Sequence, residues 1–266
     1  MFIRFIFAYC FLFVLNPHRL KLSAKENFLV AIAGLTGVTL YQFTENLALD
    51  FTTASNVSII VAICPIFTAL TSQIFLKEKH LSFNFCLGFC LAFVGVVLVS
   101  FNGKINFNLN PKGDILALIS AICWGFYSLF LTMINKKGYN TILITRKIFF
   151  YAILFMLPLM IWGIFSENPK STAYVELSAS LNAERFFSIL NWILLCFLGI
   201  LASGFCFVAW NKACNILGTV KISTGLYLIP VITIFFAAIF LNEKLTIMGT
   251  IGSALTIIGL FVSSKK

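Results

Sequence analysis

The chain has 266 residues, of which 60% are hydrophobic and only 11% are charged. A soluble protein of this size needs a charged surface, so the composition excludes a soluble globular domain and makes lipid the main solvent. The net charge of +10 could indicate either nucleic acid or a membrane, and the positions of the cations can separate the two.

Nine long apolar runs divide the chain. A helix needs about 20 residues to cross the bilayer hydrocarbon, and runs that do not alternate argue against transmembrane strands. We therefore expect an all-α, polytopic membrane helix bundle in a bacterial plasma membrane. The expected spans are residues 1–15, 28–48, 54–76, 83–101, 114–134, 144–165, 190–211, 219–241 and 246–263.

The cations are distributed unevenly between the loops. If the C-terminus is cytoplasmic, 13 of the 19 Lys and Arg residues fall on the inner side and 6 on the outer side. This asymmetry is the positive-inside pattern of membrane proteins. It predicts a cytoplasmic C-terminus and explains the net charge with the lipid bilayer, and without nucleic acid, as partner.

The first run, residues 1–15, carries one arginine and resembles a signal peptide. No small-residue cleavage site precedes Asn16, so we interpret the run as a membrane helix.

The second run carries a stripe of small and polar residues at helical spacing, and the stripe includes Gly34, Tyr41 and Glu45. Glycines allow a neighbouring backbone to come close, so Tyr41 and Glu45 should share a cavity or interface. Apart from Asp114 at the first position of span 114–134, Glu45 is the single acid within a predicted span, where a carboxylate costs several kcal/mol unless it is paired, protonated or wetted. It is either a proton or cation site or a hydrated helix end.

Two stretches of the chain repeat each other, Thr53–Lys79 and Gly218–Lys244. Pro65 and Pro230 stand 165 positions apart, and each stretch ends in Glu-Lys. Because proline lacks an N–H and crowds the preceding turn, it predicts a kink in each helix. The prolines are either hinges beside a substrate site or only shape the packing. The polar contacts expected near them are Asn56, Ser58 and Ser223, and Tyr227 should contribute to an aromatic wall.

Glycines recur at a spacing of seven in the run that follows each proline. Gly88 and Gly95 are answered by Gly252 and Gly259. This spacing predicts close helix packing, either within the chain or at a homodimer contact.

The chain divides into a first repeat at residues 1–103, with four helices, and a second repeat at residues 112–266, with five. A complete repeat has an odd number of spans, so adjacent copies insert in opposite orientations. The partner of span 114–134 is missing before Met1, which indicates a misassigned start codon or a truncated chain. Trp124 and Tyr127 share one face of that span and should line a cavity.

The eight cysteines all lie in or beside apolar runs without a CxxC pair, and His18 and His80 stand alone in loops. We interpret the cysteines as small packing residues and expect no metal site and no cofactor.

The pattern built from Tyr41, Asn46, Pro65 and Leu76-Lys77-Glu78-Lys79, with its echo at Asn211, Pro230 and Leu241-Asn242-Glu243-Lys244, resembles the EamA-type transporters of the drug/metabolite transporter superfamily. The resemblance implies ten helices in two inverted five-helix halves. It also implies alternating access and a central cavity for small metabolites, often amino acids, that are mostly exported.

We therefore expect a secondary active transporter that moves a small-molecule substrate. No nucleotide-binding loop is present, so ATP is not the direct driver. An intramembrane enzyme would need paired acids, a nucleophile with its base, or metal ligands, and the spans offer a single glutamate. The alternative is a non-transporting scaffold or a truncated remnant of a carrier. The expected substrate contacts are Tyr41, Glu45, Asn56, Ser58, Trp124, Tyr127, Ser223 and Tyr227, with Pro65 and Pro230 as hinges.

Overall fold

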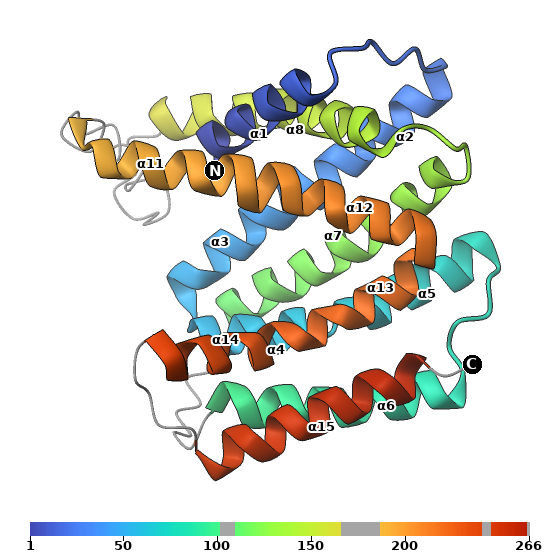
Figure 1. The fold of residues 1–266 in the computed structure, drawn as a ribbon, viewed down its shortest axis with the longest axis vertical. Helices are drawn as coiled ribbons and strands as arrows, with labels where there is room; N and C mark the ends of the chain where they lie inside the picture. The colour runs from blue at the N-terminus through green and yellow to red at the C-terminus, as the bar shows by residue number, and fades with distance from the viewer. Residues whose placement is uncertain (102–109, 166–186, 241–245, 265–266) are drawn as a thin grey trace. The chain divides into compact units, whose positions relative to one another are not determined.

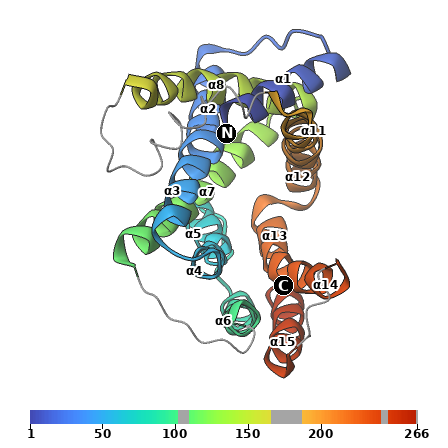
Figure 2. The same cartoon turned by 90° about the vertical axis from the view of Figure 1, so that its left-hand side faces the viewer.

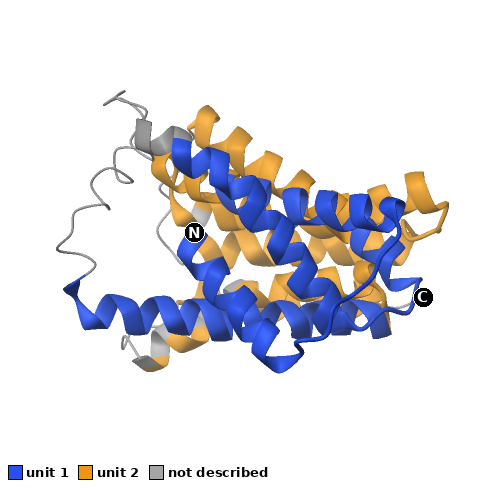
Figure 3. Cartoon of the chain, turned by 90° about the horizontal axis from the view of Figure 1, so that it is seen from above, with its two compact units in different colours: residues 1–43, 130–216 blue, residues 44–129, 217–266 orange. Residues whose placement is uncertain are grey.

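The computed structural model describes residues 1–101, 110–165, 187–240 and 246–264, and every element within these ranges is a helix (Figure 1). The expected all-α fold is confirmed. The chain forms two compact units, shown in different colours in Figure 3. Unit 1 comprises residues 1–43 and 130–216, and unit 2 comprises residues 44–129 and 217–266. Each unit therefore takes residues from both predicted repeats, and the boundaries of the repeats stay a prediction.

The helices follow one another in an order that matches the apolar runs. They are α1 (Phe2–Leu15), α2 (Ala24–Gly34), a π-helical segment (Leu35–Leu40), α3 (Tyr41–Phe51), α4 (Ala54–Val61), α5 (Cys64–Leu76), α6 (Phe83–Phe101), α7 (Pro111–Asn135), α8 (Thr141–Phe165), α11 (Ile189–Phe197), a second π-helical segment (Leu198–Phe205), α12 (Cys206–Leu217), α13 (Thr219–Ser223), a 3-10 turn (Thr224–Tyr227), α14 (Leu228–Phe240) and α15 (Ile247–Ser264).

Seven helical stretches in the described part of the chain are long and apolar enough to cross a membrane. They correspond to seven of the nine predicted runs. The other two runs are also helical, but α1 has 14 residues and the run at 219–240 is interrupted before α14. Multi-pass insertion in a membrane follows from these lengths.

Unit 1 has an aromatic core shared by α1, α8 and α12. The rings of Phe5 and Phe149 lie 5.3 Å apart, and that of Phe207 lies 5.4 Å from Phe149, both in edge-to-face geometry. Phe5 and Phe149 are completely buried. Such ring pairs add to the stabilisation by burial alone, so this core fixes how the three helices pack.

Unit 1 also contains a packing arrangement that occurs twice. A Cβ added to Gly34 would lie 2.7 Å from the carbonyl oxygen of Ile148, and one added to Gly199 would lie 2.9 Å from that of Arg4. The two glycines, Gly34 and Gly199, are 165 positions apart, which is also the offset between the two repeated prolines. The residues whose carbonyl oxygens face them, Ile148 and Arg4, are 144 positions apart. Gly34 directly precedes the π-helical segment Leu35–Leu40, and Gly199 is the second residue of the π-helical segment Leu198–Phe205. The glycine-bearing segment of each half therefore packs against a helix of the other half, α2 on α8 and the π-helical segment Leu198–Phe205 on α1.

Unit 2 is organised around α6 and α15, which lie side by side in Figures 1 and 2. A Cβ on Gly88 would lie 2.6 Å from the oxygen of Gly259, and one on Gly95 would lie 2.6 Å from that of Gly252. The pairs run in opposite sequence order, so these two helices of equivalent position are antiparallel, as inverted repeats require. The predicted glycine packing is confirmed, and α15 of the same chain covers the stripe on α6.

Candidate functional site

The helices that carry the repeated prolines are both interrupted at the same repeated position. α4 ends at Val61 and α5 begins at Cys64, so Pro65 lies in the first turn of α5, where its missing N–H is no loss. In the second half the 3-10 turn ends at Tyr227 and Pro230 lies in the first turn of α14. The side chain of Pro230 is outside the described part of the structure. The interruptions lie where the sequence predicts kinks, and the kinks themselves and bending at them stay predictions.

Tyr227 lies at the interruption in the second half and is completely buried. Its ring centroid is 6.3 Å from that of Phe89 on α6. Among the described residues its hydroxyl group has no hydrogen-bond partner. A buried hydroxyl group without a partner lowers the free energy of unfolding by about 1–3 kcal/mol, so other contacts of Tyr227 must offset this loss.

Glu45 on α3 is half-buried and belongs to the same unit. It is close enough to Cys64 to interact with it electrostatically, and Cys64 in turn interacts with Tyr227. Cys64 is fully buried at the start of α5. Its apolar surroundings in the sequence indicate a packing cysteine, and its place directly before Pro65 is the signal that distinguishes it from the others.

Trp124 and Tyr127 on α7 form an aromatic pair with ring centroids 5.2 Å apart. Both are buried. Gly125, which lies between these two residues in the sequence, allows α7 to pack closely against α5, because a Cβ there would lie 2.8 Å from the Cβ of Phe67. The Thr71 hydroxyl donates to the carbonyl oxygen of Gly125 at 3.1 Å. Two buried aromatic rings are thus held next to the helix that Pro65 begins.

Three of the expected polar contacts are engaged within the protein. The Asn56 amide donates to the Thr52 hydroxyl at 3.1 Å, and the Ser223 hydroxyl donates to the carbonyl of Val220 at 2.7 Å. The hydroxyl groups of Ser58 and Ser100 lie 3.3 Å apart and link α4 to α6. A role of these three residues in substrate binding stays a prediction. In that role they would replace these internal hydrogen bonds with hydrogen bonds to the substrate. Tyr41, at the start of α3, belongs to unit 1 and is described apart from the others.

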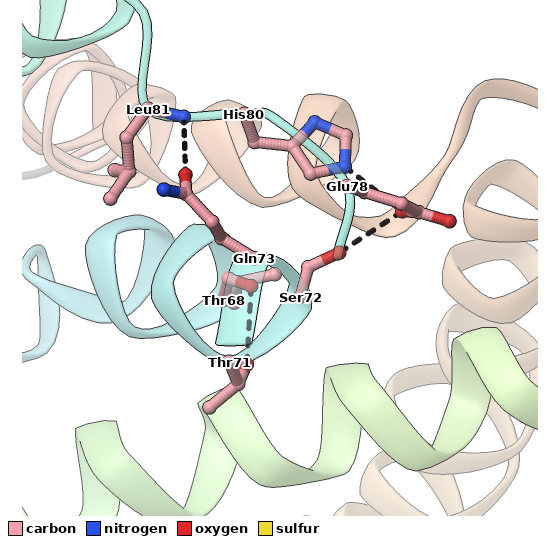
Figure 4. Close-up of polar contacts among 7 residues, drawn as sticks. All are labelled: Thr68, Thr71, Ser72, Gln73, Glu78, His80 and Leu81. Atoms are coloured by element: carbon pink, nitrogen blue, oxygen red, sulfur yellow. Dashed lines mark hydrogen bonds and ion pairs between the residues drawn. The ribbon is translucent and has the colours of Figure 1, made fainter. Parts of the chain in front are cut away.

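The Glu-Lys motif that closes the first repeated stretch forms a compact turn after α5, shown in Figure 4. Lys77 adopts the left-handed conformation with φ 57°, which ends the helix. The Glu78 carboxylate accepts from the Ser72 hydroxyl at 3.1 Å and lies 3.0 Å from Nε2 of His80. His80 therefore does not stand alone, which corrects the expectation from sequence. The matching residues 242–244 are outside the described part of the structure.

All eight cysteines are free thiols, and Cys64, Cys123 and Cys214 are buried. Within the described residues no three His, Cys, Asp or Glu side chains come together in a way that could hold a metal ion. The residues predicted for the site comprise aromatic rings, hydroxyl groups, one amide and one carboxylate, and their joint role stays a prediction.

The model of the EamA-like transporter family matches residues 1–101 and 111–265 of this chain. The chain belongs to the EamA-like transporter family. An uncharacterized transporter of Archaeoglobus fulgidus is 29% identical over 249 residues, covering 92% of this chain and 79% of the relative. The uncharacterized transporter YoaV of Bacillus subtilis is 25% identical over 98% of this chain and 84% of its own length.

One similar protein has a more specific name. It is the "Probable terminal-alkyne amino-acid exporter" of Streptantibioticus cattleyicolor, 25% identical over 91% of this chain and 75% of its own length. One protein crystal structure superimposes with a TM-score of 0.76 over 99% of this chain and 85% of its own, at 16% identity. That likeness supports the EamA-like helical fold and carries no conclusion about the substrate.

Proposed function

We propose that this chain is a secondary active transporter that exports a small metabolite, such as an amino acid, by alternating access between two inverted repeats. The family match and the named exporter among similar proteins support a carrier. The observation that carries the proposal is the hydroxyl group of Tyr227, which is buried without a partner at the interruption before α14.

An unpaired buried donor is unfavourable in the packing seen here, and it becomes favourable once an acceptor reaches it. A carboxylate or carbonyl oxygen of a solute would supply that acceptor. The helix interruptions next to Pro65 and Pro230 provide places where the backbone can bend and admit the solute. Two such bends at matched positions suit a carrier whose halves exchange their conformations.

The remaining residues of the proposed site have complementary roles. Tyr41, Trp124 and Tyr127 would offer aromatic surfaces, and Asn56, Ser58 and Ser223 would offer hydrogen bonds. Glu45 would bind the coupling proton or cation, because it is the acid within a predicted span and lies near Cys64.

A screen on proteoliposomes tests the transport proposal. The purified chain is reconstituted, loaded with one metabolite at a time, and assayed for exchange of the labelled compound, beginning with the amino acids. We expect exchange of at least one compound, reduced at least tenfold in Tyr227→Phe. Liposomes that exchange none of the compounds at any pH would favour the non-transporting scaffold.

The role of Glu45 has its own test in the same liposomes. Removal of the charge in Glu45→Gln should abolish the dependence of flux on pH between about pH 5 and pH 8, because no titrating carboxyl remains at the coupling site. Asp114→Gln, which removes an acid from the first turn of α7, is the matched control and should keep the pH dependence. A pH profile of Glu45→Gln that matches the unaltered protein would exclude Glu45 as the coupling site.

A further inference from the structure

The connection between α1 and α2, the blue loop at the top of Figure 1, is held in place by two cationic side chains of α8. The Arg146 guanidinium donates to the main-chain carbonyls of Asn16 and His18, and Lys147 Nζ donates to that of Leu20 at 3.3 Å. Arg146 is 8% exposed. A nearly buried guanidinium bound to main-chain carbonyls fixes the course of a connection that has no helix of its own.

A second set of contacts ties the beginning of α2 to the turn between α7 and α8. The Glu26 carboxylate accepts from the main-chain N–H and the hydroxyl of Ser23, both at 2.9 Å, and also from the Tyr139 hydroxyl. The bond to Glu26 raises the pKa of the Tyr139 phenol. Lys137 of the same turn is close enough to Glu26 to interact with its charge. Two connections that are distant in sequence therefore lie together in unit 1.

Five exposed cations lie on these two connections and on the first turn of α2, and one of them, Lys137, interacts with the charge of the bonded Glu26 carboxylate. We call this surface the basic platform, and it consists of Arg19, Lys21, Lys25, Lys136 and Lys137. The buried Arg146 beneath it adds positive charge and leaves its own hydrogen bonds within the protein.

Exposed apolar side chains border the basic platform on the helices that lead into it. On the last turn of α1, Phe13 is 48% exposed and Val14 is 79% exposed, and on the first turns of α2 Phe28 is 65% exposed. The Arg146 guanidinium lies 5.4 Å from the centre of the Phe13 ring. A cationic surface at the end of apolar helices fits a molecule with an anionic head and hydrocarbon chains.

We propose that the basic platform is a binding site for an anionic glycerophospholipid, whose phosphodiester head contacts the cations while its acyl chains lie along α1 and α2. General membrane electrostatics would attract any exposed lysine of the chain about equally. A fixed and pre-ordered cluster should instead bind the headgroup selectively, since less conformational entropy is lost on binding.

Competition between phosphatidylglycerol and phosphatidylcholine for the purified, delipidated full chain tests this proposal, with bound lipid counted by native mass spectrometry. The test variant is Arg19→Gln, Lys21→Gln, Lys136→Gln and Lys137→Gln combined. The control, Lys77→Gln, Lys79→Gln, Lys212→Gln and Lys221→Gln, removes the same charge from exposed lysines elsewhere. A cation that contacts the bound headgroup contributes about fivefold to lipid affinity, so the test variant should lose at least tenfold, whereas the control, whose lysines lie outside the basic platform, should lose less than twofold.

Two further arms keep the result interpretable. A variant that conserves charge, with Arg19→Lys, Lys21→Arg, Lys136→Arg and Lys137→Arg, should retain phosphatidylglycerol, which separates lost binding from lost folding. Inorganic phosphate should fail to displace the lipid. Equal losses in the test and control variants, no preference over phosphatidylcholine, or displacement by inorganic phosphate would each overturn the proposal.

Discussion

The hydroxyl of Tyr227 gives a prediction in which stability and transport change in opposite directions. Tyr227→Phe removes the unpaired buried oxygen and keeps the ring beside Phe89, so the free energy of unfolding should rise by about 1–3 kcal/mol while exchange falls. Thermal unfolding in detergent and exchange in liposomes measure the two effects. Tyr151→Phe is the control, because Tyr151 donates to Asn27 at 3.3 Å and should lose stability. A Tyr227→Phe variant that is less stable and transports normally would show that the residue serves packing alone.

The paired glycines of unit 1 give a prediction for how the helices cross. Gly34→Ala and Gly199→Ala each place a Cβ within 2.7 Å of a neighbouring atom, which should lower the free energy of unfolding by about 1–3 kcal/mol in both variants. Gly225→Ala is the control, because nothing lies within 4 Å of a Cβ at that position. Thermal unfolding of the purified variants makes the comparison. If one variant is destabilised and the other is not, the two crossings are not equivalent and the matched packing has no common energetic basis.

The course of the chain through the bilayer gives a prediction for the whole molecule. The contact between Glu26 and Tyr139 puts the α1–α2 connection and the α7–α8 turn at one end of unit 1. The predicted spans cross the membrane four times between these connections, which returns the chain to the same side. We expect this side and the C-terminus to be cytoplasmic, as the excess of Lys and Arg indicates.

Fusion reporters at the C-terminus check this orientation. A fluorescent protein that matures only in the cytoplasm should be bright after Lys266, whereas alkaline phosphatase, which is active only outside, should be inactive there. The converse result would invert the assignment of every loop and place the basic platform on the outer surface.

Periodicity and repetition in the sequence predicted the helices and the close packing at the glycines of α6 and α15, and they predicted kinks near the positions where the structure interrupts the two proline-bearing helices. Each depends on a residue type with one strong physical consequence, namely a missing Cβ or a missing N–H. The π-helical segments at Leu35–Leu40 and Leu198–Phe205 could not be predicted, because one extra residue in a turn leaves the apolar pattern of a span unchanged. The partners of Ser58 and Cys64 also depend on packing between helices that the sequence does not order in space.

The four glycines that join α6 to α15 have a consequence for how unit 2 can deform. Because the two backbones come into close contact at the glycines, sliding one past the other would drive Cβ-bearing residues such as Ala92 and Thr256 into the opposite main chain. We expect α6 and α15 to keep their positions relative to each other during the transport cycle. Movement would then be confined to the two interrupted helices, α4 with α5 and α13 with α14, which would pivot while α6 and α15 stay together.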